Sequence, residues 1–211
     1  MGIWLIYYGI ASAQRDEYLH WFEGQHIDEK LARPGYDCAC HYEVVSGGLP
    51  DHSDHVYIAM FGGNTTRPFF DPSPAQIKPN QDELTRTMIG HRVKATSAIL
   101  TEEWFEYPAN RTDHPEARPL VNSPTIRLGI FAPSVDDQEV VAWCAQTHFP
   151  TLAKSDELVI ARKWLASFGA NRHMVLEEHA GDAVVANGAW QEQTTNLMYK
   201  PATASLRVFR E

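Results

Sequence analysis

The chain has 211 residues, enough for one large domain or two small ones. Its composition, with 44% hydrophobic and 21% charged residues, excludes disordered, collagen-like and coiled-coil proteins. A net charge of −9 repels phosphate backbones and anionic lipid, so we expect no nucleic acid and no membrane among its partners.

The first half predicts the element order strand, helix, strand, strand, helix, strand. Residues 3–9 alternate as a strand does, and the next helix carries Tyr18, Phe22 and His26 along one stripe. Pro34-Gly35 then turns the chain. The predicted elements are a strand at 3–9, a helix at 14–31, strands near 38–46 and 55–61, a helix near 81–97 and a strand at 99–107.

The second half predicts the same order. Its elements are a strand at 125–132, a helix at 136–153, strands near 159–168 and 173–179, a short helix around 182–193 and a strand at 203–209. The order βαββαβ is the ferredoxin-like unit. We therefore expect an α+β protein with one such repeat over 1–107, a proline-stiffened linker over 108–124 and a second repeat over 125–211.

A short motif supports this duplication. Trp21-x4-His26 recurs as Trp143-x4-His148 at an offset of 122 (143 − 21). The strand that opens at His55 matches the one at His173 at an offset of 118 (173 − 55). The order and spacing of the elements agree between the halves, which indicates an internal repeat.

A long loop interrupts the first repeat. Residues 62–80 hold four prolines around the adjacent pair Phe69 and Phe70. Such a loop is either a lid over a pocket or a plug for the edge of its own domain.

These residues resemble a known group. A strand, a helix with Trp21-x4-His26, the turn Pro34-Gly35 and a strand with His41-Tyr42 are similar to the dimeric α+β barrel superfamily, which includes EthD-like proteins, muconolactone isomerases, polyketide cyclases, small cofactor-free monooxygenases and haem-binding chlorite dismutases. In these, two ferredoxin-like units pack their sheets into one barrel. The resemblance implies that both units lie here in one chain, and it specifies fold better than function.

Strand alternation assigns the two faces of the sheet. Val56, Ile58 and Met60 are purely apolar and are expected to meet the helices, as are Met174 and Leu176. The opposite face is expected either to line a ligand cavity or to be partly exposed to solvent. It carries His55, Tyr57, Ala59 and Phe61 in one strand and His173, Val175 and Glu177 in the other.

His26 and His148 are the first catalytic candidates. Each follows an apolar helix position by four residues and so points along the buried edge of its helix. Each is a general base near neutral pH or a packed residue that donates to a carbonyl. The matching residue often lines the pocket in the resembling families. Pro150 predicts a helix break just after His148.

Neighbouring strand residues offer further candidates. His41 and Tyr42 point to opposite faces, so only one of them enters a cavity, and the sequence leaves the choice open. If His41 and its match Arg162 face inward, they pair a base with a cation for an anionic substrate. His55 and His173 complete the catalytic candidates. The expected substrate-binding residues are Tyr57, Phe61, Arg162, Arg127, Trp21 and His91.

Metal and cofactor motifs are weak. No histidine pair has H-x-x-x-H or H-E-x-x-H spacing, and a site built from His26, His55, His91 and Glu177 has no local support. Glycine motifs for phosphates and dinucleotides are absent. The histidine spacing and the missing glycine motifs together lead us to expect neither a metal nor an organic cofactor.

The leading hypothesis is a cofactor-independent lyase, isomerase or cyclase that acts on a small aromatic or apolar, carboxylated or hydroxylated metabolite. The alternatives are a cofactor-free monooxygenase with Trp4, Trp104 and Trp164 in its walls, a metal-dependent barrel enzyme and a non-catalytic binding or stress-response barrel. An odd count of three cysteines and the absence of a signal peptide predict a cytoplasmic protein. The barrel is either complete alone or pairs as a homodimer through its outer strands.

Overall fold

A computed structural model describes residues 1–47, 54–112, 123–131, 136–180 and 199–209. The described strands are β1 (Gly2–Ile10), β2 (Cys38–Gly47), β3 (His55–Gly63), β4 (Val93–Glu106), β5 (Thr125–Phe131), β6 (Leu158–Phe168), β7 (His173–His179) and β8 (Tyr199–Phe209). The described helices are α1 (Arg15–Trp21), α2 (Ile27–Leu31), α3 (Pro74–Ile77), α4 (Glu83–Gly90), α5 (Asp137–Trp143) and α6 (Phe149–Leu152).

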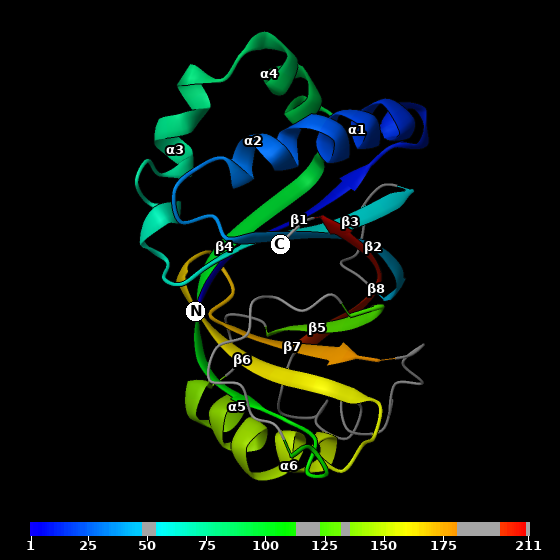
Figure 1. Cartoon of the computed structure of the whole chain (residues 1–211), viewed down its shortest axis with the longest axis vertical. Coiled ribbons are helices and arrows are strands. Elements are labelled where there is room, and N and C mark those ends of the chain that lie inside the picture. Colours follow the sequence, from blue (N-terminus) through cyan, green and yellow to red (C-terminus); the bar gives the residue numbers. More distant parts are fainter. Residues whose placement is uncertain (48–53, 113–122, 132–135, 181–198, 210–211) are drawn as a thin grey trace.

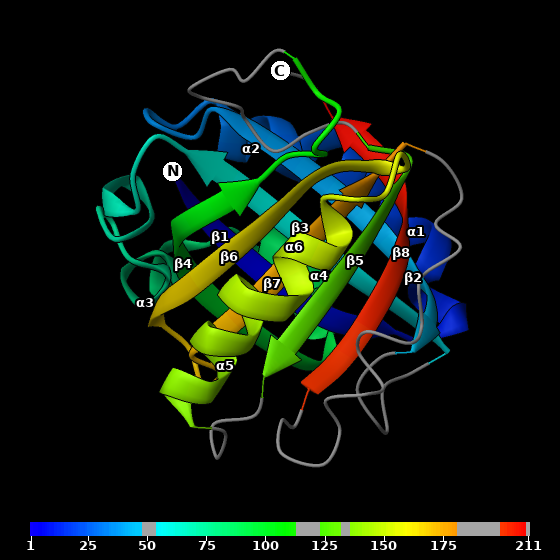
Figure 2. The same ribbon diagram turned by 90° about the horizontal axis from the view of Figure 1, so that it is seen from below.

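The strands form one closed barrel in the order β1-β3-β2-β8-β5-β7-β6-β4, and β4 pairs again with β1 (Figure 2). Each half supplies four consecutive strands, β4-β1-β3-β2 from the first and β8-β5-β7-β6 from the second. The two sets have the same internal order, and they join through the pairs β2–β8 and β4–β6. The predicted α+β barrel of two fused ferredoxin-like repeats is confirmed.

Helices cover the barrel on two opposite sides. In Figure 1, α1 to α4 lie against the sheet of the first repeat, and α5 and α6 lie against that of the second. Three apolar cores result, one inside the barrel and one under each group of helices. None of the described helices is long and apolar enough to cross a bilayer.

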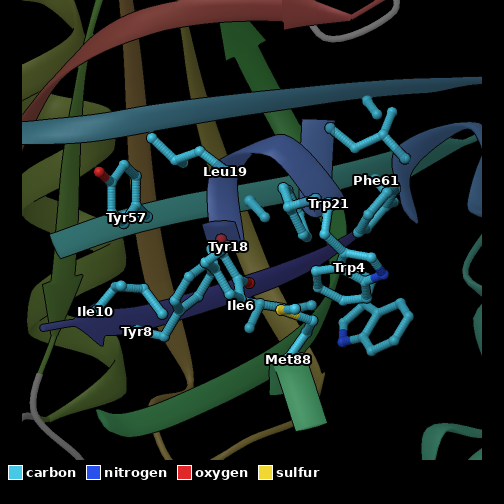
Figure 3. Close-up of a cluster of buried hydrophobic side chains, with 14 of the residues drawn as sticks. Trp4, Ile6, Tyr8, Ile10, Tyr18, Leu19, Trp21, Tyr57, Phe61 and Met88 are labelled. Carbon is cyan, nitrogen blue, oxygen red and sulfur yellow. The ribbon is translucent and has the colours of Figure 1, made fainter. Parts of the chain in front are cut away.

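The predicted assignment of strand faces is wrong. Ile58 and Met60 point into the barrel, whereas Tyr57 and Phe61 are buried beneath the helices of the first repeat. In β7, likewise, Met174 and Leu176 are inside the barrel and Val175 is under the second helix layer. An eight-stranded barrel has an interior that side chains just fill. Here aliphatic residues fill it together with Tyr7, Tyr42 and Trp164. A second set of aromatic residues packs in the layer between the first sheet and its helices (Figure 3).

Three local predictions also change. The helix expected to reach residue 97 ends at Gly90, and the fourth strand begins at Val93 rather than at 99. Pro150 does not break the helix, because α6 continues through it. Phe69 is fully buried against Tyr36 and plugs the edge of its own core, whereas Phe70 is 40% exposed. The predicted helix at 182–193 and most of the linker, 113–122, lie outside the described residues.

Candidate functional site

A π-helical turn explains the repeated Trp-x4-His motif. Residues Phe22–His26 and Cys144–His148 each form such a turn inside an otherwise α-helical stretch. In each, the next backbone N–H donates to the carbonyl five residues earlier, Ile27 to Phe22 and Phe149 to Cys144. The wider turn places residues i and i+5 one above the other. Such turns are frequent at functional sites.

His26 stacks on Trp21 with ring centroids 4.4 Å apart and is 5% exposed. Burial, with the positive charges of Lys30, Arg92 and Arg33, lowers the pKa of His26 to about 2. Its Nδ1 lies 3.4 Å from Oε2 of Glu29 without hydrogen-bond geometry. His26 is therefore a neutral imidazole at physiological pH.

A pocket of about 140 Å³ opens beside His26. It lies between α2 and the segment that holds α3 and α4, which covers α2 from outside in Figure 1. By volume it holds on the order of ten water molecules. Its lining is polar apart from one isoleucine and consists of His26, Glu29, Lys30, Arg33, Ile77, Asn80, Gln81, Asp82 and Thr85.

Positive charge gathers around this pocket. Burial and the neighbouring Arg33 and Arg92 lower the pKa of Lys30 to about 8. The Lys30 ammonium lies 5.0 Å from the centroid of the Trp4 ring. Nη1 of Arg33 and Nη2 of Arg92 are buried without a hydrogen-bond partner. Within the described ranges, none of these three cations forms an ion pair.

The acidic groups of the pocket are engaged elsewhere or exposed. Asp82 caps α4 and accepts hydrogen bonds from the backbone N–H and the hydroxyl of Thr85, each at 2.8 Å. Glu29 accepts a 2.7 Å bond from Gln25 and is 45% exposed. Together with Arg92, which is not part of the pocket wall, Lys30 and Arg33 make three cations near His26 against these two carboxylates.

A buried hydrogen-bonded chain lies under the same helices. The Tyr8 hydroxyl lies 2.9 Å from Nε2 of His41, and Nδ1 of His41 lies 3.2 Å from Oε1 of Glu23. With Nδ1–H donating to the carboxylate, Nε2 accepts from the phenol. Burial raises the pKa of Tyr8 well above its usual range, so the phenol keeps its proton. The guanidinium of Arg92 lies 4.5 Å from the centroid of the Tyr8 ring, and its Nε donates to Tyr18 at 2.8 Å.

His55 and Tyr57 belong to a separate network at the end of β3. Nδ1 of His55 lies 3.1 Å from Glu43, and Arg15 donates to Tyr57 at 2.9 Å and to Glu43 at 3.1 Å. These groups neutralise one another near the surface, and none of them lines the pocket.

In the second repeat, the histidine that matches His26 contacts a buried carboxylate. His148 stacks on Trp143 at 4.3 Å, but its Nε2 lies 2.9 Å from Oε1 of the buried Glu177. Burial opposes ionisation of Glu177, but hydrogen bonds from His148 and His179 and the charge of Arg127 outweigh it and lower the pKa to about 2. The arrangement is a compensated buried ion cluster.

A second compensated cluster lies beside it. The ammonium of Lys163 lies 2.7 Å from Glu103 and 2.8 Å from Nδ1 of His173, whose Nε2 lies 2.9 Å from Asp137. Burial and Lys163 lower the pKa of His173, against the effect of Asp137. His173 is thereby held in an ion-pair network.

Tyr42 and Arg162 face the barrel interior and not the helices. Arg162 is 1% exposed and donates to Glu102 at 2.6 Å and to Glu178 at 3.1 Å. His41 lies on the opposite face, so the alternative in which His41 and Arg162 share one cavity is not realised. By face, His41 corresponds to Lys163, one residue further along than the sequence alignment placed it.

The predicted site residues therefore lie in different parts of the fold. His26 lines the pocket, and the ring of Trp21 stacks on the imidazole of His26. His41 lies under the same helices, and Phe61 is packed in the core there. His91 follows the end of α4 and is not among the pocket residues. His148, Arg127 and His173 lie on the far side of the barrel.

Sequence reasoning missed Lys30, Arg33, Asp82 and Arg92. Lys30 and Arg33 follow His26 by four and seven residues, which is the spacing of one helix face, so this part was readable from the sequence. Asp82 directly precedes α4 and Arg92 follows it, so only the folding of the chain brings them close to His26.

No group of three or more His, Cys, Asp or Glu side chains in the described residues is arranged to hold a metal ion. In particular, His26 and Glu177 lie under different helix layers, so the four residues considered for a metal site are not brought together.

A scan against protein-family models gave no match, and neither did a search of curated proteins. Solved structures do resemble the chain. A provisionally assigned monooxygenase from Fusobacterium nucleatum matches 99% of this chain and 93% of its own, with a TM-score of 0.59 and 10% identity. An anthrone oxidase-like protein matches 100% and 94%, with a TM-score of 0.55 and 9% identity. A provisionally assigned chlorite dismutase matches 98% and 95%, with a TM-score of 0.53 and 13% identity. The chain therefore shares an α+β barrel fold with these structures.

Proposed function

We propose that this protein is an enzyme that moves protons on a small anionic metabolite bound beside His26. The single observation that carries this proposal is a neutral, buried histidine in the wall of a polar pocket that also holds Lys30 and Arg33. Lyase, isomerase or cyclase chemistry without an organic cofactor is the form we favour. The three free, buried cysteines support a reducing compartment such as the cytoplasm.

The residues divide the work by their protonation states. The imidazole of His26 is uncharged at neutral pH, which is the state a general base requires, but with a pKa of about 2 it is a weak base until a bound anion offsets the neighbouring cations. Lys30, whose pKa is lowered to about 8, holds a proton that it can return to the product. Arg33 remains a cation and would stabilise negative charge on an enolate or carboxylate. Tyr42, which the sequence offered as a candidate for a cavity, faces the barrel interior and has no role in this assignment.

The polar lining refines the expected substrate. Ile77 is the one apolar residue of the pocket wall, so the carboxylated or hydroxylated part of the predicted metabolite fits better than the aromatic part. A pocket for about ten water molecules admits a correspondingly small ligand.

Cofactor-free oxygenation is the second candidate. The names of two structural neighbours, a provisionally assigned monooxygenase and an anthrone oxidase-like protein, favour it. Such a reaction begins with the same proton abstraction, after which the substrate carbanion itself reduces O₂. Within the described residues, no cluster of three or more His, Cys, Asp or Glu side chains favours a reaction at a bound metal ion.

Solvent deuterium exchange tests the shared first step. Small carboxylates with an acidic C–H bond are incubated with the enzyme in D₂O, and loss of the C–H signal is followed by proton NMR. We expect His26→Gln to lower the exchange rate roughly 10²- to 10⁴-fold. His20→Gln, an exposed histidine of α1, is the control and should keep the full rate.

The outcomes separate the candidates. Exchange with oxygen uptake, recorded by an oxygen electrode, would favour oxygenation, and exchange without uptake would favour a lyase or isomerase. A rate lost in His148→Gln and kept in His26→Gln would place the base in the second repeat and contradict the proposal. No exchange by any member of the panel, combined with binding, would favour a non-catalytic barrel.

A further inference from the structure

The cations of the pocket are a feature that acid–base chemistry alone does not require. Lys30 is 5% exposed, although a lysine is seldom buried unless it is paired. Arg33 carries a buried donor with no acceptor, and so does Arg92. In a protein of net charge −9, three neighbouring cations without ion pairs in the described residues are costly to the fold.

We propose that Lys30 and Arg33, with the charge of Arg92 behind them, form a subsite for one carboxylate group. This inference rests on the proposed function for the identity of the pocket, but the binding it describes does not require any chemistry. The unfilled donors point to an acceptor supplied from outside the chain.

The charge of the pocket selects a monoanion. Lys30 and Arg33 in the pocket wall, with Arg92 near His26 but outside that wall, stand against the two carboxylates of Glu29 and Asp82, so one added negative charge balances these five groups. A doubly charged phosphate would leave an excess of negative charge in a half-enclosed space. The guanidinium of Arg33 also matches the planar geometry of a carboxylate, to which arginine donates two parallel hydrogen bonds.

Binding of a carboxylate in this subsite would also change the pKa of His26. The groups that set its protonation are Lys30 and Arg33 on one side, Arg92 and Asp82 at the two ends of α4, and Glu29 one turn further along its own helix. The three cations lower the pKa of His26, and a bound carboxylate offsets them. His26 then becomes a stronger base when the substrate is present than when the pocket is empty.

Isothermal titration with benzoate tests the subsite. Benzamide, the neutral compound of the same shape, and inorganic phosphate are titrated in parallel at pH 7. We expect benzoate to bind the native protein, and Lys30→Met and Arg33→Met each to weaken its binding at least tenfold. Arg86→Met, which removes an exposed cation of α4 outside the pocket, should leave binding unchanged. Circular dichroism verifies that each variant is folded.

The opposite results would overturn the subsite. The first is that benzamide binds as tightly as benzoate, and the second is that phosphate binds more tightly than benzoate. The third is that neither Lys30→Met nor Arg33→Met lowers the affinity for benzoate. If benzoate binds but no substrate exchanges deuterium, the proposed function is contradicted and the subsite is still supported. Exchange that is indifferent to both Lys30→Met and Arg33→Met would overturn the subsite and the proposed roles of these two residues, and would leave His26 as the base.

A histidine NMR titration tests the coupling. The His26 signal is assigned by its loss in His26→Gln, and its pKa is measured with and without saturating benzoate. An upward shift of the pKa on binding supports the coupling, and an unchanged pKa with benzoate bound contradicts it. Acetate serves as a second carboxylate probe that lacks the ring.

Discussion

The imidazole of His26 stacks on the indole of Trp21, five residues earlier in the same helix, at a centroid separation of 4.4 Å. In a regular α-helix, residues five apart differ by about 140° around the axis and cannot stack. The π-helical turn Phe22–His26 removes this difference. The stacking holds His26 on the side of the helix that meets α3 and α4, where the pocket lies.

Lys30→Met is expected to stabilise the protein while it weakens ligand binding. The lowered pKa of Lys30 means that the fold disfavours the charged ammonium at pH 7. Methionine keeps most of the apolar stem and removes the charge, so we expect a gain of about 1 kcal/mol or more in the free energy of unfolding. Urea denaturation at pH 7 measures it, and a loss of stability would show that the charge is structurally required.

His26 should make the protein sensitive to mild acid. In the unfolded chain it takes up a proton near pH 6.5, whereas in the fold its pKa is about 2. The unfolded state then binds more protons, so stability is lost as the pH falls below 6.5, at about 1.4 kcal/mol per pH unit. His26→Gln should flatten this slope between pH 6 and 4, measured by urea denaturation, whereas His20→Gln should keep it.

Glu177→Gln is expected to destabilise the second repeat. It removes the buried carboxylate that pairs with His148 and Arg127. Breaking a buried ion pair costs about 3–5 kcal/mol. Because the pKa of Glu177 is lowered to about 2, the stability that the carboxylate provides is present above pH 4.5 and is lost as the pH falls towards 2.

The matched control is Glu157→Gln, at an exposed carboxylate next to β6, which should change the free energy of unfolding by less than about 0.5 kcal/mol. Benzoate binding by Glu177→Gln below its unfolding transition should equal that of the native protein. Loss of binding in the folded variant would show that the two repeats share one site.

Phe69 and Phe70 provide a matched pair in the segment that covers the pocket. Phe69→Ala empties a fully buried position and should cost about 3–5 kcal/mol. Phe70→Ala acts on a side chain that is 40% exposed and should change stability by about 0.5 kcal/mol. Thermal unfolding measures both, and equal losses would mean that Phe70 also packs in solution.

Gly35 is expected to tolerate no side chain. It has φ +81°, and a Cβ there would lie 2.4 Å from the ring of Pro68, which leads into the segment with α3 and α4. Gly35→Ala should therefore lower stability and weaken benzoate binding by displacing this pocket wall. Gly24→Ala, with open space around its Cβ and a helical position, should be neutral or stabilising by roughly 0.5–1 kcal/mol.

Much of the candidate site was readable from local pattern. The Trp-x4-His repeat led to His26. Lys30 and Arg33 were missed, although their helical spacing from His26 places them on the same helix face. The chemical equivalence of His26 and His148 was not readable, since it depends on neighbours. Glu177 reaches His148 from β7, and no acidic residue reaches His26 at that distance from β3.

The sequence by itself determined the order and type of the elements and their duplication, because the strand period of two and the helix stripe are local properties. Only the tertiary structure decided which face of each strand meets the helices. Both faces are largely apolar, so the strand pattern leaves the choice open, and it is made only when the eight strands close into a barrel and the helices cover its outside. The fold also decided the chemistry of the pocket, because Arg92 and Asp82 approach His26 from more than fifty residues away in the chain.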